Sequence, residues 1–335
     1  MRYGNLRLVY FRVFFILMTF YGVVAHSGSF IEREDVVAYF GELSQVHGFS
    51  KKNLEEIFLG HEPNVRILNL MSKPTEKRLE WHEYRKILVD QPRISLGLEF
   101  WENNVQILQD AERIYGVAPE VIVAIIGVET RYGKIMGSFS VVQALATLAF
   151  DFPSRADFFR RELTEYLVLT RSQKLDPLSL KGSYAGAMGY GQFMPSSYQA
   201  YAVDFDGDGF KDIWNNKADA IGSVANYFSE HGWQGDGPVI VRGYKQGDFE
   251  DSISANHSLK PNVSAGELRE KGIKSSLADA TEVALFLMQA EGGEEYWLGL
   301  SDFYVITRYN HSSMYALAVY QLSQALREKY MELSK

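Results

Sequence analysis

Cysteine is absent from this 335-residue sequence. Disulfides, thiolate zinc sites, iron–sulfur clusters, a cysteine nucleophile and a lipid on an N-terminal cysteine are therefore excluded. An excess of positive charge is missing too, because 34 Lys and Arg stand against 42 Asp and Glu, for a net charge of −8. A surface that grips nucleic-acid phosphates is basic, so we expect no nucleic-acid partner.

Signatures of several other enzyme classes are also missing. The sequence has no His-Glu-x-x-His motif, no Gly-x-Ser-x-Gly motif and no Gly-x-Gly-x-x-Gly motif, and its seven histidines are scattered. What is present is an ordinary globular balance, with 46% apolar and 23% charged residues. The length suits two or three modules around a shared core.

The first 25 residues have the pattern of a secretory signal. Arg2, Arg7 and Arg12 precede an apolar run from Val13 to Ala25, which is shorter than the ~20 residues of a membrane span. We expect a signal peptide at 1–25, with an uncleaved N-terminal anchor as the alternative. Export without cysteines suits a bacterial periplasm, so we predict a periplasmic protein that is not a lipoprotein.

The spacing of apolar residues predicts a mainly helical α+β fold. Phe100–Tyr115 repeats apolar residues at helical spacing, and the almost wholly apolar stretch from Pro119 to about Arg131 predicts a buried core helix. Between 235 and 300 polar residues and glycines interrupt short apolar runs, which indicates a small β-rich insert. We therefore divide the chain into the signal at 1–25, an N-terminal helical region at 26–100, a core at 101–234, a β-rich subdomain at 235–300 and a C-terminal segment at 301–335 that completes the core.

A single carboxylate lies on the apolar face of the predicted core helix. Glu129 follows Ile125 by four residues and Ile126 by three, so it projects from their side of the helix. It also lies near the helix C-terminus, where the dipole disfavours negative charge. Burial and the dipole both raise the pKa of a carboxyl, which suits a general acid. The alternative is a structural glutamate that pairs with Arg131 or with a distant arginine.

A glycine-rich stretch is the second candidate element. It runs from Tyr184 to Tyr198, and its glycines at 186, 189 and 191 allow tight turns and a close approach of ligand to backbone. Gln192 offers both a donor and an acceptor to a sugar hydroxyl or an N-acetyl group. The alternative is a connector that merely packs closely.

Together these stretches resemble a known family. Gly127–Gly133, which reads GVETRYG, and Gly186–Tyr198 are similar to the two signature stretches of lytic transglycosylases with a lysozyme-like core. The closer match is to the membrane-bound lytic murein transglycosylase B family. It extends through Phe152–Ala156, Ala220–Tyr227 and Arg308–Ser312, and it covers the chain from residue 30 to the C-terminus.

The resemblance implies a lysozyme-like helical core and an enzyme that cleaves the bond between MurNAc and GlcNAc in peptidoglycan. Glu129 falls on the family's catalytic acid/base. Peptidoglycan strands are the implied partner, with cell-wall synthesis proteins as further candidates and a monomer as the expected state. The implied substrate-binding residues are Ser183, Gln192, Tyr227, Tyr309, Asn310, Tyr315 and Arg155. By themselves these residues leave alternatives open: a helix cap at Asn310, core tyrosines at Tyr227 and Tyr315, and a surface charge at Arg155.

The number of acids bears on the chemistry. Most glycosidases use two carboxyl groups, yet no second acid is obvious beside Glu129. Asp151 and Asp157 are the nearest in the motif-bearing sequence, and they have no signature of their own. One acid suffices where the substrate supplies the nucleophile, because the C6 hydroxyl of MurNAc can close on C1 and give a 1,6-anhydro sugar. A hydrolytic muramidase and a non-catalytic peptidoglycan-binding or scaffolding protein remain the alternatives.

The stretch Asp204–Gly209 matches the first half of an EF-hand loop. The twelfth position is Asn215, where a regular EF-hand has glutamate, while the resembled family has a longer loop that a later aspartate closes. The expectation is a structural Ca²⁺ in a loop at 204–219, with Asp212 as a second candidate for the last ligand, and no organic cofactor. A solvated acidic turn is the alternative. The expected ligands are Asp204, Asp206, Asp208, the carbonyl of Phe210 and Asp219.

Overall fold

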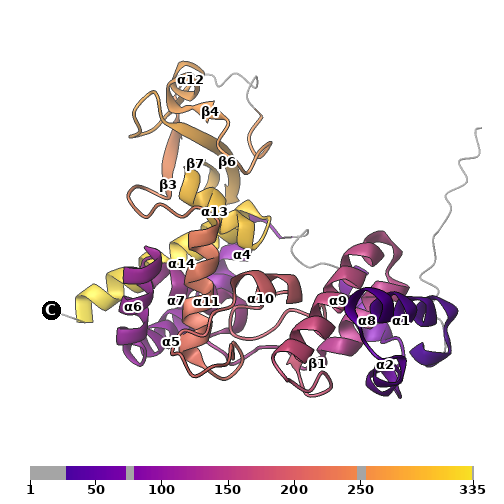
Figure 1. Ribbon diagram of the computed structural model, residues 1–335. Helices are drawn as coiled ribbons and strands as arrows, with labels where there is room; N and C mark the ends of the chain where they lie inside the picture. The colour runs from indigo at the N-terminus through magenta and orange to yellow at the C-terminus, as the bar shows by residue number, and fades with distance from the viewer. Residues whose placement is uncertain (1–27, 73–78, 247–253, 334–335) are drawn as a thin grey trace, which may run out of the picture.

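The computed structural model describes residues 28–72, 79–246 and 254–333 (Figure 1). These residues form a mainly helical body that carries a small β-sheet at one side, which confirms the predicted fold class. The predicted signal at 1–25 lies outside the described residues, and the predicted domain boundaries stay a prediction. In the described part of the chain, no helix combines the length and the apolar character that crossing a membrane requires.

Helix α7 (Pro119–Thr130) forms the centre of the core. Its side chains from Val121 to Ile126 are all buried, as expected for a helix that is apolar on every side. Pro119 starts the helix, where its fixed backbone angle fits the first turn. The helices that pack around α7 are α5 (Gln91–Glu102), α6 (Val105–Tyr115), α11 (Lys217–Glu230) and α14 (Ser313–Leu333).

A second group of helices brings together segments that are distant in the sequence. Helix α8 (Val141–Asp151) packs along α9 (Ala156–Ser172), and in Figure 1 both lie beside α1 (Glu34–His47) and α2 (Lys51–Phe58). Helix α3 (Val65–Ser72) also packs on α8. We call α1–α3, α8 and α9 the α8–α9 lobe.

A buried ion pair fastens this lobe. Arg33 precedes α1 and donates two hydrogen bonds to the carboxylate of Asp151 at the end of α8, over 2.9 and 2.8 Å. The carboxylate of Asp151 is fully buried, so its charge needs this partner. The chain before α1 is therefore joined to a helix more than one hundred residues later.

The remaining helices link the α8–α9 lobe, the core and the sheet. Helix α4 (Trp81–Leu88) packs on α14, and α10 (Pro195–Tyr201) packs on both α9 and α11. Helix α13 (Ser301–Tyr309) returns the chain from the sheet to the core. Short elements complete this part: the 3-10 helices η1 (Phe30–Glu32) and η3 (Pro153–Arg155), and the strand pair β1 (Phe139–Ser140) and β2 (Lys181–Gly182).

The β-rich insert is a five-stranded sheet in the order β4-β6-β7-β3-β5, with antiparallel neighbours throughout. Phe286 of the sheet packs on Phe303 of α13 at a centroid distance of 5.1 Å, which joins the insert to the core. The elements are β3 (Ile240–Lys245), β4 (Val263–Ser264), α12 (Ala265–Glu270), β5 (Ile273–Lys274), β6 (Glu282–Ala290) and β7 (Gly293–Gly299).

Candidate active site

Glu129 is the penultimate residue of α7, and the chain turns sharply after it. Arg131 and Tyr132 both have left-handed backbone angles, with φ of 49° and 62°. The turn directs Tyr132 back against the helix, where a side chain at Gly127 would collide with its ring and hydroxyl. In the sequence GVETRYG, Gly127 leaves the space in which the ring of Tyr132 packs against the end of α7.

Thr130 joins this helix end to the glycine-rich segment, which we define as residues 186–194. Its side chain is buried, and its hydroxyl donates to the carbonyls of Tyr190 at 3.0 Å and Ile126 at 3.1 Å. The same oxygen accepts a hydrogen bond from the N–H of Gly133 over 3.0 Å. The residue after Glu129 therefore fixes the distance between α7 and the glycine-rich segment.

Tyr315 contacts Glu129 directly. Its hydroxyl donates a hydrogen bond to Oε1 of Glu129 over 2.5 Å from the first part of α14. Burial raises the pKa of Tyr315 well above its ordinary value, and the charge of Glu129 raises it further. Tyr315 therefore stays protonated, and its hydroxyl donates to Oε1 both when Glu129 is ionised and when Glu129 holds a proton on Oε2.

Two further tyrosines interact with Tyr315, namely Tyr309, which also interacts with Glu129, and Tyr84. Burial, and then the charge of Glu129, raises the pKa of Tyr309 well above its ordinary value, and its hydroxyl donates to the carbonyl of Gly191 over 2.6 Å. Tyr84 is buried on α4 and interacts electrostatically with Tyr315. Sequence analysis missed Tyr84, because it belongs to none of the quoted motifs and reaches the site only through the packing of α4 on α14.

Gln192 occupies a strained position in the glycine-rich segment. Its φ of 51° lies in the left-handed region, which a residue with a side chain rarely adopts. Its amide nitrogen donates to the carbonyls of Gly189 at 2.9 Å and Met136 at 3.2 Å. Strain of this kind is typical of functional sites, where the surrounding structure holds it in place.

Tyr227 of α11 belongs to an aromatic cluster beside the segment. Its hydroxyl donates to the carbonyl of Arg308 over 2.6 Å, and its ring meets the rings of Tyr309 at 4.7 Å and Phe193 at 5.9 Å. It also stacks on His231 at 4.0 Å. This cluster places Tyr227 next to the tyrosines that surround Glu129.

The other three predicted binding residues have different surroundings. The hydroxyl of Ser183 accepts hydrogen bonds from the N–H groups of Ala185 and Ala187, over 3.2 and 3.0 Å, at the start of the glycine-rich stretch. Asn310 directly follows Tyr309 at the end of α13. Arg155 is exposed on the α8–α9 lobe, where its guanidinium stacks over Phe158 at 4.4 Å. The described contacts of Arg155 do not reach the residues around Glu129.

The predicted metal loop brings three carboxylates together. Oxygen atoms of Asp204, Asp206 and Asp219 lie within 4.8 Å of one another. Asp219 is fully buried in the first turn of α11 and accepts hydrogen bonds from the N–H groups of Phe205 at 2.7 Å and Asp212 at 2.8 Å. Burial raises its pKa, and the charges of Asp206 and Asp204 add to that effect. Hard oxygen donors of this kind fit Ca²⁺.

The other predicted ligands stand outside this group of three. Asp208 is exposed, and its carboxylate accepts a hydrogen bond from the N–H of Phe210 over 2.8 Å. Asp212, the second candidate for the last ligand, accepts from the N–H groups of Trp214 and Asn215, both over 2.9 Å. Asp212 therefore shapes the end of the loop, while Asp219 belongs to the carboxylate group.

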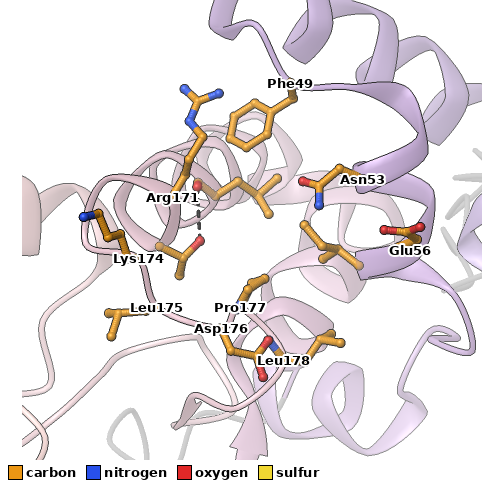
Figure 2. Close-up of a pocket in the computed structure, with 12 residues that line it drawn as sticks. Phe49, Asn53, Glu56, Arg171, Lys174, Leu175, Asp176, Pro177 and Leu178 are labelled. Carbon is orange, nitrogen blue, oxygen red and sulfur yellow. Dashed lines mark hydrogen bonds between the residues drawn. The ribbon is translucent and has the colours of Figure 1, made fainter.

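A separate cavity of about 560 Å³ lies between α2 and the end of α9 (Figure 2). Apolar side chains such as Phe49 and Leu175 line it together with the charged groups of Arg171, Lys174 and Asp176. None of the predicted site residues lines it. The cavity therefore has no part in the site around Glu129.

Comparison with known proteins identifies the family. Residues 32–324 match the Transglycosylase SLT domain. The chain is 39% identical over 322 residues to membrane-bound lytic murein transglycosylase B of Escherichia coli K12, covering 93% of this chain and 88% of that protein. The crystal structure of soluble lytic transglycosylase SltB1 from Pseudomonas aeruginosa is 47% identical with a TM-score of 0.84, over 88% of this chain and 99% of that one.

A calcium complex is among the similar structures. The Escherichia coli lytic transglycosylase Slt35 in complex with calcium is 40% identical with a TM-score of 0.84, over 92% of this chain and 97% of that one. The resemblance drawn from the two motif stretches is thereby confirmed. The chain belongs to the transglycosylase SLT family and is a lytic transglycosylase, an enzyme of the class that acts on peptidoglycan.

Proposed function

We propose that this protein cleaves the β1,4 bond between MurNAc and GlcNAc without water, with Glu129 as the sole general acid/base. The observation that carries the proposal is the hydrogen bond from Tyr315 to Glu129 on the apolar core helix. A relative supports the substrate: SltB3 of Pseudomonas aeruginosa, 30% identical, has been solved in complex with NAG-anhNAM-pentapeptide. We infer that this chain likewise binds peptidoglycan strands.

The proposed reaction needs a single carboxyl group. Glu129 donates its proton to the bridging oxygen as the bond from C1 of MurNAc breaks, and the acetamido oxygen of the same sugar stabilises the developing positive charge. Glu129 then accepts the proton of the C6 hydroxyl as O6 bonds to C1. The bridging oxygen leaves with a proton on GlcNAc, and the other product is a 1,6-anhydroMurNAc end.

Neighbouring groups would orient the acid and the sugar. Tyr315 fixes one oxygen of Glu129 by its hydrogen bond, which sets the direction of the carboxyl group. Tyr309 is half-buried and uses its hydroxyl on a backbone carbonyl, so we propose that it offers its ring to the glycan. Tyr227 is 7% exposed and stacks on His231, so we propose that it contacts the glycan through the edge of its ring. We propose Gln192, Ser183 and Asn310 as the polar contacts of the sugar; Arg155 would require a glycan that extends to the α8–α9 lobe.

We also propose that the loop at 204–219 binds Ca²⁺ in a structural role. Asp204, Asp206 and Asp219 would supply the converging carboxylates, and Asp208 and the carbonyl of Phe210 would complete the shell. The calcium complex of Slt35 supports this assignment. The loop connects α10 to α11, so a bound ion would hold Tyr227 of α11 in register with the glycine-rich segment.

Digestion of purified sacculi tests the proposed reaction. We expect the wild-type protein to release fragments lighter by one water than reducing muropeptides, and Glu129→Gln to release none. Reducing ends would identify a hydrolytic muramidase. If the wild type released nothing and still co-sedimented with sacculi, the protein would be a binding or scaffolding protein.

We infer that the enzyme works in the periplasm after export by residues 1–25. The membrane-bound relative in Escherichia coli supports an envelope location. Fractionation of cells that express residues 1–335 or 26–335 tests this inference. The full chain should appear in the periplasm and the shortened chain in the cytoplasm, and equal distributions would contradict it.

A further inference from the structure

A buried glutamate in the α8–α9 lobe contacts the start of α10, which directly follows the glycine-rich segment. Glu162 of α9 is only 4% exposed. Its Oε2 accepts a hydrogen bond from the N–H of Ser196 over 2.9 Å, and its Oε1 accepts one from the Ser196 hydroxyl over 2.7 Å. Within the described residues, Ser196 supplies both donors and no cation pairs with this carboxylate.

The contact between Glu162 and Ser196 depends on where α10 begins. A carboxylate out of water needs donors that point at it, and a residue in the first turn of a helix has a free N–H group that can serve as one. Ser196 is in the first turn of α10. Glu162 is therefore satisfied only while α10 begins at this place beside α9.

The start of α10 directly follows the end of the glycine-rich segment. Phe193 lies two residues before Pro195, the first residue of α10, and its ring meets the rings of Tyr227 at 5.9 Å and Tyr309 at 6.0 Å. Earlier in the segment, Thr130 holds the carbonyl of Tyr190. The segment is thus tied to the catalytic helix at one end and to the α8–α9 lobe at the other.

We propose that Glu162 is a positioning residue for the glycan. Through Ser196, Glu162 fixes the position of the glycine-rich segment relative to Glu129. It therefore affects the affinity for the glycan and leaves the proton transfer by Glu129 unchanged. This inference rests on the proposed function. It assigns to the α8–α9 lobe a part in substrate binding that does not require any of its side chains to touch the sugar.

The chain contains a matched control on the same two helices. Glu165, one turn further along α9, accepts a hydrogen bond from Gln199 of α10 at an exposed position. For Glu162→Ala we expect the half-saturating concentration of sacculi to rise about tenfold, while the maximum rate stays within about twofold of the wild type. Glu165→Ala should behave as the wild type in both quantities.

Two further readouts separate positioning from mere stability. The pH profile of the maximum rate should be the same in Glu162→Ala and the wild type, because Glu162 does not contact Glu129. Glu162→Gln should recover most of the affinity, since its carbonyl oxygen can accept from the Ser196 N–H and its amide can donate to the Ser196 hydroxyl. A lower melting temperature of Glu162→Ala with an unchanged half-saturating concentration would overturn the inference.

A binding measurement keeps this inference distinct from the proposed reaction. The double variant Glu129→Gln/Glu162→Ala should bind sacculi about tenfold more weakly than Glu129→Gln alone in a co-sedimentation assay. If Glu162→Ala does not fold, Ser196→Ala removes only the hydroxyl and should weaken binding about threefold. A wild type that releases no fragments contradicts the proposed function, whereas an active wild type with unimpaired binding in these variants contradicts only the inference about Glu162.

Discussion

The Tyr315 hydroxyl and Oε1 of Glu129 lie 2.5 Å apart, in a hydrogen bond between residues 186 positions apart in the chain. The contact closes the core, because α7 carries the acid and α14 brings the tyrosine after the chain has passed through the β-sheet. Burial keeps the pKa of Tyr315 well above its ordinary value, so the hydroxyl remains a donor at neutral pH.

Removal of the Tyr315 hydroxyl should slow the reaction more than it weakens the fold. Tyr315→Phe keeps the buried ring and removes the hydrogen bond that the hydroxyl donates to Oε1 of Glu129. We expect the rate on sacculi to fall about tenfold, which is near the worth of a hydrogen bond to a charged group. Initial rates and melting curves check this. Tyr320→Phe on the same helix is the control, and equal rates in the two variants would refute the role of Tyr315.

The hydroxyl of Thr130 should be required at the end of α7. Thr130→Val has nearly the same shape but leaves the Tyr190 carbonyl and the Gly133 N–H without this partner, so we expect a loss of about 1–3 kcal/mol in the free energy of unfolding and a lower rate. Thr130→Ser keeps the oxygen and should restore the rate. Denaturant unfolding and sacculus digestion measure both effects. Activity of the valine variant at the level of the serine variant would show that the hydroxyl is dispensable.

Gly127 should not tolerate even a methyl group. A Cβ at this position would lie too close to the hydroxyl and ring of Tyr132. We expect Gly127→Ala to destabilise the protein by about 1–3 kcal/mol in spite of the better helix propensity of alanine. Gly41→Ala in α1 is the matched control, since nothing lies within 4 Å of the added methyl group there. It should be neutral or stabilising in the same thermal unfolding experiment.

Calcium should stabilise the fold more at neutral than at acid pH. Burial raises the pKa of Asp219 in the folded state, so without a cation its contribution to stability is lost as pH rises from about 4 through the folded pKa. A bound Ca²⁺ relieves this cost because it favours the ionised carboxylate. Melting temperatures with Ca²⁺ and with chelator, between pH 4 and 7, test the expected trend.

Substitution in the loop supplies the control for the calcium prediction. Asp204→Ala should abolish the calcium-dependent rise in melting temperature, whereas Asp236→Ala, at an exposed position outside the loop, should keep it. An equal rise in both variants would show that calcium acts elsewhere on the protein.

The sequence was most informative where a local pattern determines structure. The spacing of Ile125, Ile126 and Glu129 predicted an acid on an apolar helix, and α7 has this residue in its last turn. The family motifs and the β-rich texture after residue 235 led to the fold class, which is confirmed. Both conclusions rely on neighbours within a few turns of chain or on motif similarity.

Contacts between distant elements could not be predicted in this way. Tyr84 was missed because its place near Tyr315 depends on how α4 packs on α14. The pairing of Glu162 with Ser196 likewise depends on how α9 packs against α10, and the periodicity of the sequence does not predict that packing. The order of the helices also concealed the α8–α9 lobe, which combines the first described helices with two from the middle of the chain.

The contact of Arg33 with Asp151 limits how far the polypeptide can be shortened. Phe30, which is fully buried against Phe58 and Phe150, lies beside this ion pair. A recombinant fragment that started after Arg33 would remove the guanidinium that donates to the buried carboxylate of Asp151, and it would leave a cavity in place of the Phe30 side chain. A shortened protein for expression should therefore begin no later than Phe30, because Phe30 and Arg33 pack into the interior of the α8–α9 lobe.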